Sequence, residues 1–107
     1  MEKIFNLFED SGWVDAKEYP TGTKEKVLFD DHGMKTLLLK LPKGFFMDAH
    51  AHLYTEQHIV MQGSYTSEGK TYDEGTYRSF NAHENHGPFK SDTGALVLVV
   101  WTPSQPE

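Results

Sequence analysis

The sequence contains no cysteine in its 107 residues. This absence excludes a disulfide framework, and it excludes zinc and iron–sulfur sites built on thiolates. Any bound metal must therefore be held by nitrogen and oxygen ligands. No apolar run approaches the roughly 20 residues of a membrane-spanning helix, and the first residues lack the apolar core of a signal peptide. We therefore expect a soluble, cytoplasmic protein.

Basic residues are also scarce. Ten Lys and Arg stand against 16 Asp and Glu, and the formal net charge is −6. The basic residues form no cluster, so neither nucleic acid nor an anionic membrane surface is an expected partner. A chain of this length supports one core. We predict a single domain over residues 1–107, with an N-terminal arm at about residues 1–20 and a frayed tail at 103–107.

Helix signals are few, and turn residues recur along the whole chain. Nine glycines and five prolines separate short runs with high β-propensity, at residues 27–29, 35–41, 57–65, 76–80 and 95–102. Regularly spaced short strands between turn signals are typical of an all-β sandwich or barrel. Only residues 2–9 could form a short helix.

Two of the expected strands are apolar on both faces. Residues 37–39 and 96–101 break the alternation expected of a half-buried antiparallel strand. One face would line the interior of the barrel. The other face would be covered by a partner subunit in a homodimer, which we expect, or by the N-terminal arm, which carries Phe5, Phe8 and Trp13.

The six histidines provide the strongest functional signal. His50 and His52 would point to the same face of a strand, because side chains alternate along it. The three residues that follow His52 are enough for a turn, so Glu56 could return on the neighbouring strand and face the same ion. His86, before a Gly-Pro pair, is the best candidate for a fourth ligand.

Three imidazoles and one carboxylate suit a divalent transition metal such as Fe, Mn, Ni, Zn or Cu. Calcium and magnesium sites are built from oxygen ligands instead. Four protein ligands leave two positions open on an octahedral ion, which is typical of a reactive site rather than a closed structural one. The alternative for the His50–Glu56 segment is a solvated polar face on an edge strand.

These residues also resemble a known family. The spacing Gly44-(five residues)-His50-Ala51-His52-(three)-Glu56-(six)-Gly63 is similar to the first cupin motif at every specified position. The second motif begins at Gly75 and has its ligand histidine at His86. It departs from the family pattern at Asn81, His83 and Lys90.

Within the cupins, the sequence resembles the cupin domain of ChrR-type anti-sigma factors and their acetylacetone-cleaving dioxygenase relatives. The similar segments include Glu74-Gly75-Thr76-Tyr77 and His86-Gly87-Pro88. The resemblance implies a single jelly-roll-like cupin β-barrel, usually dimeric, with one divalent metal ion (Fe, Mn, Ni or Zn) inside its mouth.

Two kinds of function are compatible with such a site. The first is a metal-dependent enzyme that acts on a small oxygen-bearing substrate: a dioxygenase, or an isomerase or lyase that acts on a sugar acid. Glu56 would then stay bound or act as a base, and His58 or His83 would relay a proton; the alternative for His58 is a partly buried barrel histidine. The second is a metal-dependent sensor or ligand-binding module without turnover.

Two groups of aromatic residues and one histidine have predicted positions outside the ligand set. One of Phe45 and Phe46 should point inward, because neighbouring side chains on a strand face opposite ways. His32 should lie in a turn. The tyrosines after residue 60 should cover the surface of the sheet: Tyr65, Tyr72 and Tyr77.

Overall fold

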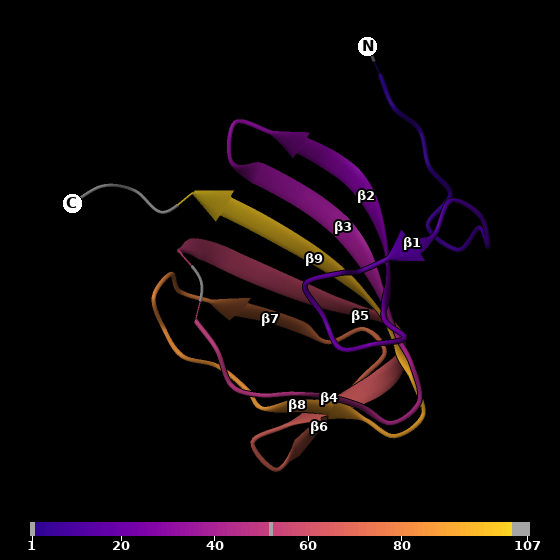
Figure 1. Cartoon of the computed structure of the whole chain (residues 1–107). Coiled ribbons are helices and arrows are strands. Elements are labelled where there is room, and N and C mark those ends of the chain that lie inside the picture. Colours follow the sequence, from indigo (N-terminus) through magenta and orange to yellow (C-terminus); the bar gives the residue numbers. More distant parts are fainter. Residues whose placement is uncertain (1, 52, 104–107) are drawn as a thin grey trace.

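The structure is a computed structural model and describes residues 2–51 and 53–103 (Figure 1). These residues contain strands, turns and irregular segments, as predicted for an all-β chain. The strands, in chain order, are β1 (Val14–Asp15), β2 (Lys24–Asp31), β3 (Met34–Leu41), β4 (Phe45–Met47), β5 (Tyr54–Ser67), β6 (Lys70–Asp73), β7 (Tyr77–Phe80), β8 (Phe89–Ser91) and β9 (Ala95–Pro103). None of the described residues forms a helix that is long and apolar enough to cross a membrane.

All the strand pairs are antiparallel, and they follow the order β1-β2-β3-β9-β5-β8-β4. Strands β6 and β7 both pair with β5, the longest strand. The sheet curls on itself, so that β4, β6 and β8 lie below the broad blade formed by β2, β3, β9 and β5 (Figure 1). This is the curled barrel predicted from the sequence.

The core fills the concave side of this curl. Leu37, Leu39 and Leu41 alternate along β3, and Val97 and Val99 face the same side from the neighbouring strand β9. The opposite wall contributes four aromatic side chains to the same cluster: Phe45, Tyr65, Phe80 and Phe89. Phe45 is buried and Phe46 is exposed, as the alternation predicted.

The N-terminal arm covers part of the convex side. The Lys26 ammonium donates to the carbonyl of Glu9 at 3.0 Å, and the Lys40 ammonium pairs with Asp10 at 3.3 Å. The same two lysines lie over the Trp13 ring, 4.8 and 5.3 Å from its centroid.

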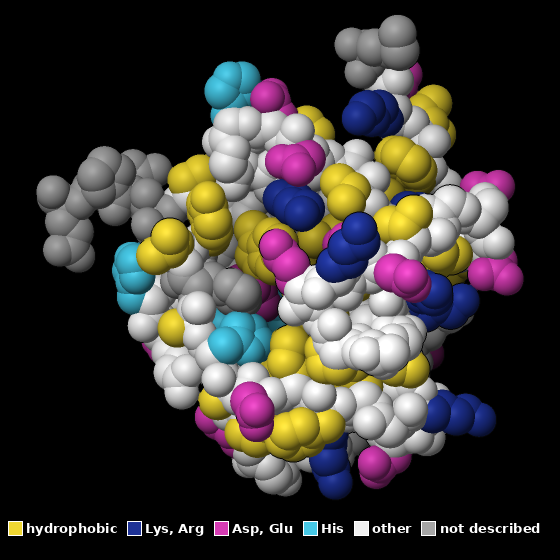
Figure 2. Space-filling view, in the orientation of Figure 1, with side chains coloured by type: hydrophobic (Ala, Val, Ile, Leu, Met, Phe, Trp, Pro, Cys, Tyr) yellow, Lys and Arg dark blue, Asp and Glu magenta, His cyan; other side chains and the backbone are white. Residues whose placement is uncertain are grey.

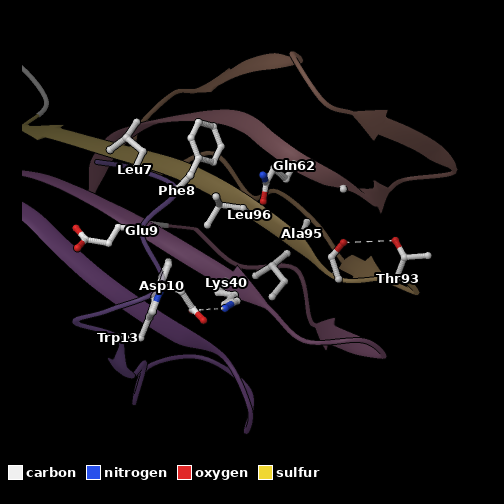
Figure 3. A pocket seen from close by; sticks show the side chains of 13 residues that line it. Leu7, Phe8, Glu9, Asp10, Trp13, Lys40, Gln62, Thr93, Ala95 and Leu96 are labelled. Atoms are coloured by element: carbon white, nitrogen blue, oxygen red, sulfur yellow. Dashed lines mark hydrogen bonds and ion pairs between the residues drawn. The ribbon is translucent and has the colours of Figure 1, made fainter. Parts of the chain in front are cut away.

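A hollow of about 360 Å³ remains between this arm and β9 (Figure 3). Leu7 and Phe8 face Leu96 across it. The arm therefore provides some of the outer cover that the doubly apolar strands need. Hydrophobic side chains still lie exposed near the N-terminal end and over the sheet (Figure 2).

One sequence-based expectation about the N-terminal end was wrong. No helix forms over residues 2–9, because Asn6 closes a turn: its side chain accepts from the backbone N–H of Phe8 at 3.0 Å, and its carbonyl accepts from the backbone N–H of Glu9 at 3.1 Å. Such local bonds compete with a helix. At the other end, Pro103, the first residue of the predicted tail, is the last residue of β9, and the remainder of that tail lies outside the described residues.

The expectation that Tyr65 covers the sheet surface was also wrong, because its side chain is only 2% exposed. Glu56, His58 and Val60 face inward at every second position of β5. The register against β9 then shifts between Val60 and Gln62. Such a bulge inserts one residue and reverses the alternation, so Tyr65 points inward with the core.

Candidate functional site

Two of the predicted ligands lie opposite each other across a short antiparallel bridge. The backbone N–H of His50 donates to the carbonyl of His86, and the N–H of His86 donates to the carbonyl of His50, both at 2.8 Å. Their ring centroids are 4.7 Å apart. The curl of the sheet thus brings together two histidines that are 36 positions apart in the sequence.

Gly87 makes this bridge possible. Its φ is +105°, and a Cβ atom there would lie 3.0 Å from the Cα of Ala49 and 3.1 Å from the Phe89 ring. A larger residue would therefore separate the two segments. The Phe80 ring also packs against His86, with 4.3 Å between the two ring centroids, and helps to bury the imidazole.

Glu56 is the third predicted ligand and is almost fully buried, with 3% of its surface exposed. Its Oε2 atom lies 3.9 Å from Nε2 of His86. Strand β5 places Glu56 opposite Trp101 of β9, and the indole N–H of Trp101 donates to Oε1. Nε2 of His58 hydrogen-bonds Oε2. A buried carboxylate needs such donors, because desolvation of an unpaired charge is costly.

His58, the second predicted catalytic residue, continues this network away from Glu56. Its Nδ1 atom lies 3.0 Å from the Tyr65 hydroxyl, and Arg78 donates to the same hydroxyl at 3.3 Å. His58 and Tyr65 are both buried. Burial raises the pKa of Tyr65, and the Arg78 hydrogen bond and charge oppose that shift.

The donor set fits a transition metal in its chemistry. Nδ1–H of His50 donates to the carbonyl of Asp48 at 3.0 Å, which places the basic lone pair on Nε2. Metal-binding histidines are commonly oriented by such a carbonyl. However, among the residues that the structure describes, no three His, Asp or Glu side chains form a metal-binding group. The fourth predicted ligand, His52, lies outside the described residues, so the four-ligand set stays a prediction.

A narrow cavity of about 30 Å³ opens beside these residues, with room for roughly two water molecules. Apolar side chains of β3, β4 and β9 line it, together with His50, Glu56, His58, Tyr65 and Tyr19. Burial raises the pKa of Tyr19, and the Glu56 charge adds to that shift. The deprotonated form of Tyr19 is therefore disfavoured here.

A larger hollow of about 500 Å³ lies outside the cavity, and Phe46 and Trp101 are among its lining residues. Tyr19, Met47 and His50 line both spaces. These three side chains therefore separate the outer hollow from the buried carboxylate.

Sequence reasoning missed several residues of this site, including Tyr19 and Arg78. Trp101 could have been found, because it shares the inward parity of Val97 and Val99 on β9. Arg78 lies opposite His58 in the register of β7 and β5, but that pairing is not visible in the sequence. His83 has a φ of +66° in an exposed loop, and His32 lies in a turn as expected, with a φ of +52°.

A curled antiparallel barrel with histidines and a glutamate gathered on its concave side defines the protein as a cupin. The ChrR cupin-like domain model matches residues 1–105. The chain therefore belongs to the ChrR cupin-like family. No curated protein matches the chain in sequence.

Solved structures with the same fold differ in function. An RmlC-like cupin from Shewanella frigidimarina is 21% identical, with a TM-score of 0.77 over 97% of this chain and 94% of that one. An acetylacetone dioxygenase from Acinetobacter johnsonii is 14% identical, with a TM-score of 0.77 over 94% of this chain and 74% of that one. A chain in the complex of Rhodobacter sphaeroides SigE with the anti-sigma ChrR is 21% identical, with a TM-score of 0.73 over 89% of this chain and 51% of that one. These identities establish the shared fold.

Proposed function

We propose that the protein is a metal-dependent enzyme that acts on a small oxygen-bearing organic molecule. The proposal is carried by two contacts and one shared cavity: His50 is bridged to His86, Oε2 of Glu56 lies 3.9 Å from Nε2 of His86, and His50 and Glu56 line the same narrow cavity. With His52 these three side chains would hold one divalent ion of Fe, Mn, Ni or Zn. When bound, such an ion supplies Lewis acidity and open positions for small molecules.

The chain's own residues would perform three tasks around that ion. Trp101 and His58 donate to the two oxygens of Glu56 and so hold the carboxylate in one orientation. Tyr19 and Met47 lie where the outer hollow meets the inner cavity, and would limit the entry of water. Glu56, with His58 behind it, is the group placed to accept a proton from a bound substrate.

The lining favours an uncharged substrate. The outer hollow contains the carboxylates of Glu18 and Asp48, and neither space is lined by Lys or Arg among the described residues. Lys35 does lie over the Trp101 ring, but it lines a different hollow, together with Asp30. Because unpaired anions are repelled by such a lining, we favour a neutral diketone or phenolic ketone over a sugar acid.

Elemental analysis of freshly purified protein tests the proposal first. Wild-type protein should contain one equivalent of a transition metal, and His50→Ala and His86→Ala should each lose most of it. His32→Ala is the matched control, because that side chain is 89% exposed and should leave the metal content unchanged. Wild-type protein that stays metal-free after incubation with each of Fe, Mn, Ni and Zn would disprove the site.

Oxygen uptake then separates the candidate functions. Iron together with uptake in the presence of a small β-diketone supports a dioxygenase, and a β-keto acid of the same size should bind more weakly. Turnover of a sugar acid without oxygen would support an isomerase or lyase instead. Zinc without turnover of any of these compounds would support the second candidate, a metal-dependent sensor, which the similarity to the complex that contains the anti-sigma ChrR suggests.

We also propose that the protein forms a homodimer through the convex face of the sheet. Leu98 and Val100 of β9 are only half-buried, and Tyr77, which lies in the same row as Leu98 on the far side of Ile59, is exposed. Analytical ultracentrifugation at micromolar concentration should give the mass of two chains. The mass of a single chain would show that the N-terminal arm alone covers this face.

A further inference from the structure

Four polar side chains form a continuous path into the site. The path begins at the half-buried Arg78, passes through the Tyr65 hydroxyl and the His58 ring, and ends on Glu56. Tyr65, His58 and Glu56 are each less than 9% exposed. Of these four residues, only His58 and Glu56 were predicted from the sequence as site residues.

The chemistry of the two end groups sets the direction of the outer hydrogen bonds in the path. A guanidinium has donors and no acceptor, so the Tyr65 oxygen must accept from Arg78. A carboxylate has acceptors and no donor, so Nε2–H of His58 donates to Oε2 of Glu56. Between these two bonds, the Tyr65 hydroxyl lies 3.0 Å from Nδ1 of His58.

Packing holds the two outer members in place. The Arg78 guanidinium lies over the rings of Tyr72 and Phe80, 4.1 and 4.7 Å from their centroids. The Tyr65 ring packs against Phe89 at 5.6 Å. Because burial raises the pKa of Tyr65, its hydroxyl keeps the proton that it donates.

We propose that Arg78 and Tyr65 are positioning residues that fix the proton of His58 on Nε2, so that His58 always presents a donor to Glu56. Together with the Trp101 N–H on Oε1, this arrangement supplies a donor to both carboxylate oxygens and holds the carboxylate plane in one orientation. The part of this inference that concerns metal affinity rests on the proposed function, in which Glu56 is a ligand.

Long-range ¹H–¹⁵N NMR on metal-free, full-length protein at pH 7.5 tests the tautomer directly. The spectrum of wild-type protein should show a proton on Nε2 of His58. A proton on Nδ1 together with none on Nε2 would overturn the inference. This measurement needs no metal, so it is independent of the proposed function.

Two variants and one control test the positioning role. Tyr65→Phe removes the donor to Nδ1, and Arg78→Gln leaves the Tyr65 hydroxyl without its cationic partner. Each should populate the Nδ1-protonated tautomer and weaken metal binding about tenfold, a typical cost for losing an outer partner of a ligand. Tyr72→Phe removes a hydroxyl from a ring that also packs on Tyr65 and Arg78, and should change neither property.

The outcomes separate the two proposals. If wild-type protein binds metal but both variants keep the Nε2 tautomer and full affinity, the positioning role is wrong. If wild-type protein binds no metal while the tautomer responds to Tyr65→Phe and Arg78→Gln as expected, the proposed function is wrong and the role of the two residues toward His58 stands. Arg78 is half-buried, so Arg78→Gln provides the test should Tyr65→Phe fail to fold.

Discussion

The hydrogen bond from Trp101 to Glu56 should stabilise the fold because it ends on a buried carboxylate. The indole N–H donates to Oε1 of a side chain that is 3% exposed. A hydrogen bond to a charged group contributes about 1.5–3 kcal/mol, against about 0.5–1.5 kcal/mol for a neutral pair. Trp101→Phe removes this donor and some packing, so it should lower the free energy of unfolding by about 2 kcal/mol or more.

A double-mutant cycle isolates the charged part of that effect. Glu56→Gln keeps an acceptor at the same place but removes the charge. The packing loss of Trp101→Phe is common to both backgrounds and cancels, so Trp101→Phe should cost about 1 kcal/mol less in the Glu56→Gln background than in the wild-type background. Urea denaturation of the four metal-free proteins at pH 7.5 measures this coupling. Equal costs in both backgrounds, within about 0.4 kcal/mol, would show that the charge of Glu56 does not strengthen this hydrogen bond.

Three further predictions concern the backbone, alkaline stability and metal retention. Gly63→Ala should unfold at a clearly lower temperature than Gly69→Ala. Both positions have positive φ, but a Cβ at 63 would collide with the backbone at residue 94, whereas the space at 69 is open. Equal melting temperatures would contradict this prediction. Burial raises the pKa of Tyr19, so the unfolded chain loses the Tyr19 hydroxyl proton before the folded protein does, and the free energy of unfolding should fall above about pH 10. Tyr19→Phe should flatten that decline by up to about 1.4 kcal/mol per pH unit. Tyr77→Phe, at an exposed position, should leave the decline unchanged. Imidazoles bind metal only when neutral and ordinarily titrate near about pH 6.5, so dialysis should strip the metal between pH 7 and pH 5, and unchanged metal content at pH 5 would count against imidazole ligands.

The sequence predicted the regular parts of the fold well. Residues 35–41 and 95–102 fall within β3 and β9, because their apolar runs match a strand that is covered on both sides. The inward position of Phe45 followed from alternation. These features depend on neighbouring residues along one strand, which a single sequence displays directly.

Features that depend on register between strands could not be predicted. Tyr65 was expected on the surface, and the bulge after Val60 turned it inward. His58 shares the inward parity of Glu56 on β5 and contacts it, which fits its predicted place beside Glu56 in the site, but the partners on the far side of His58 were not predicted. Arg78 reaches this network only because β7 pairs with β5 in one particular register.

The predicted metal ligands differ in how directly the sequence indicates that they lie close together. The spacing from Gly44 to Gly63 predicted His50 and Glu56, and the structure places them on segments that meet at the same cavity. His86 joins them through the bridge to His50, a contact that the separation in sequence does not reveal. The presence of the ion itself stays a prediction.

Crystals soaked with Mn²⁺ or Fe²⁺ would show whether the predicted ligands hold an ion, because anomalous scattering locates the metal. One strong anomalous peak is expected within bonding distance of a ring nitrogen of His50, a ring nitrogen of His86 and a carboxylate oxygen of Glu56, at roughly 2.0–2.3 Å. A peak bound to other residues, or no peak in fully soaked crystals, would contradict that expectation.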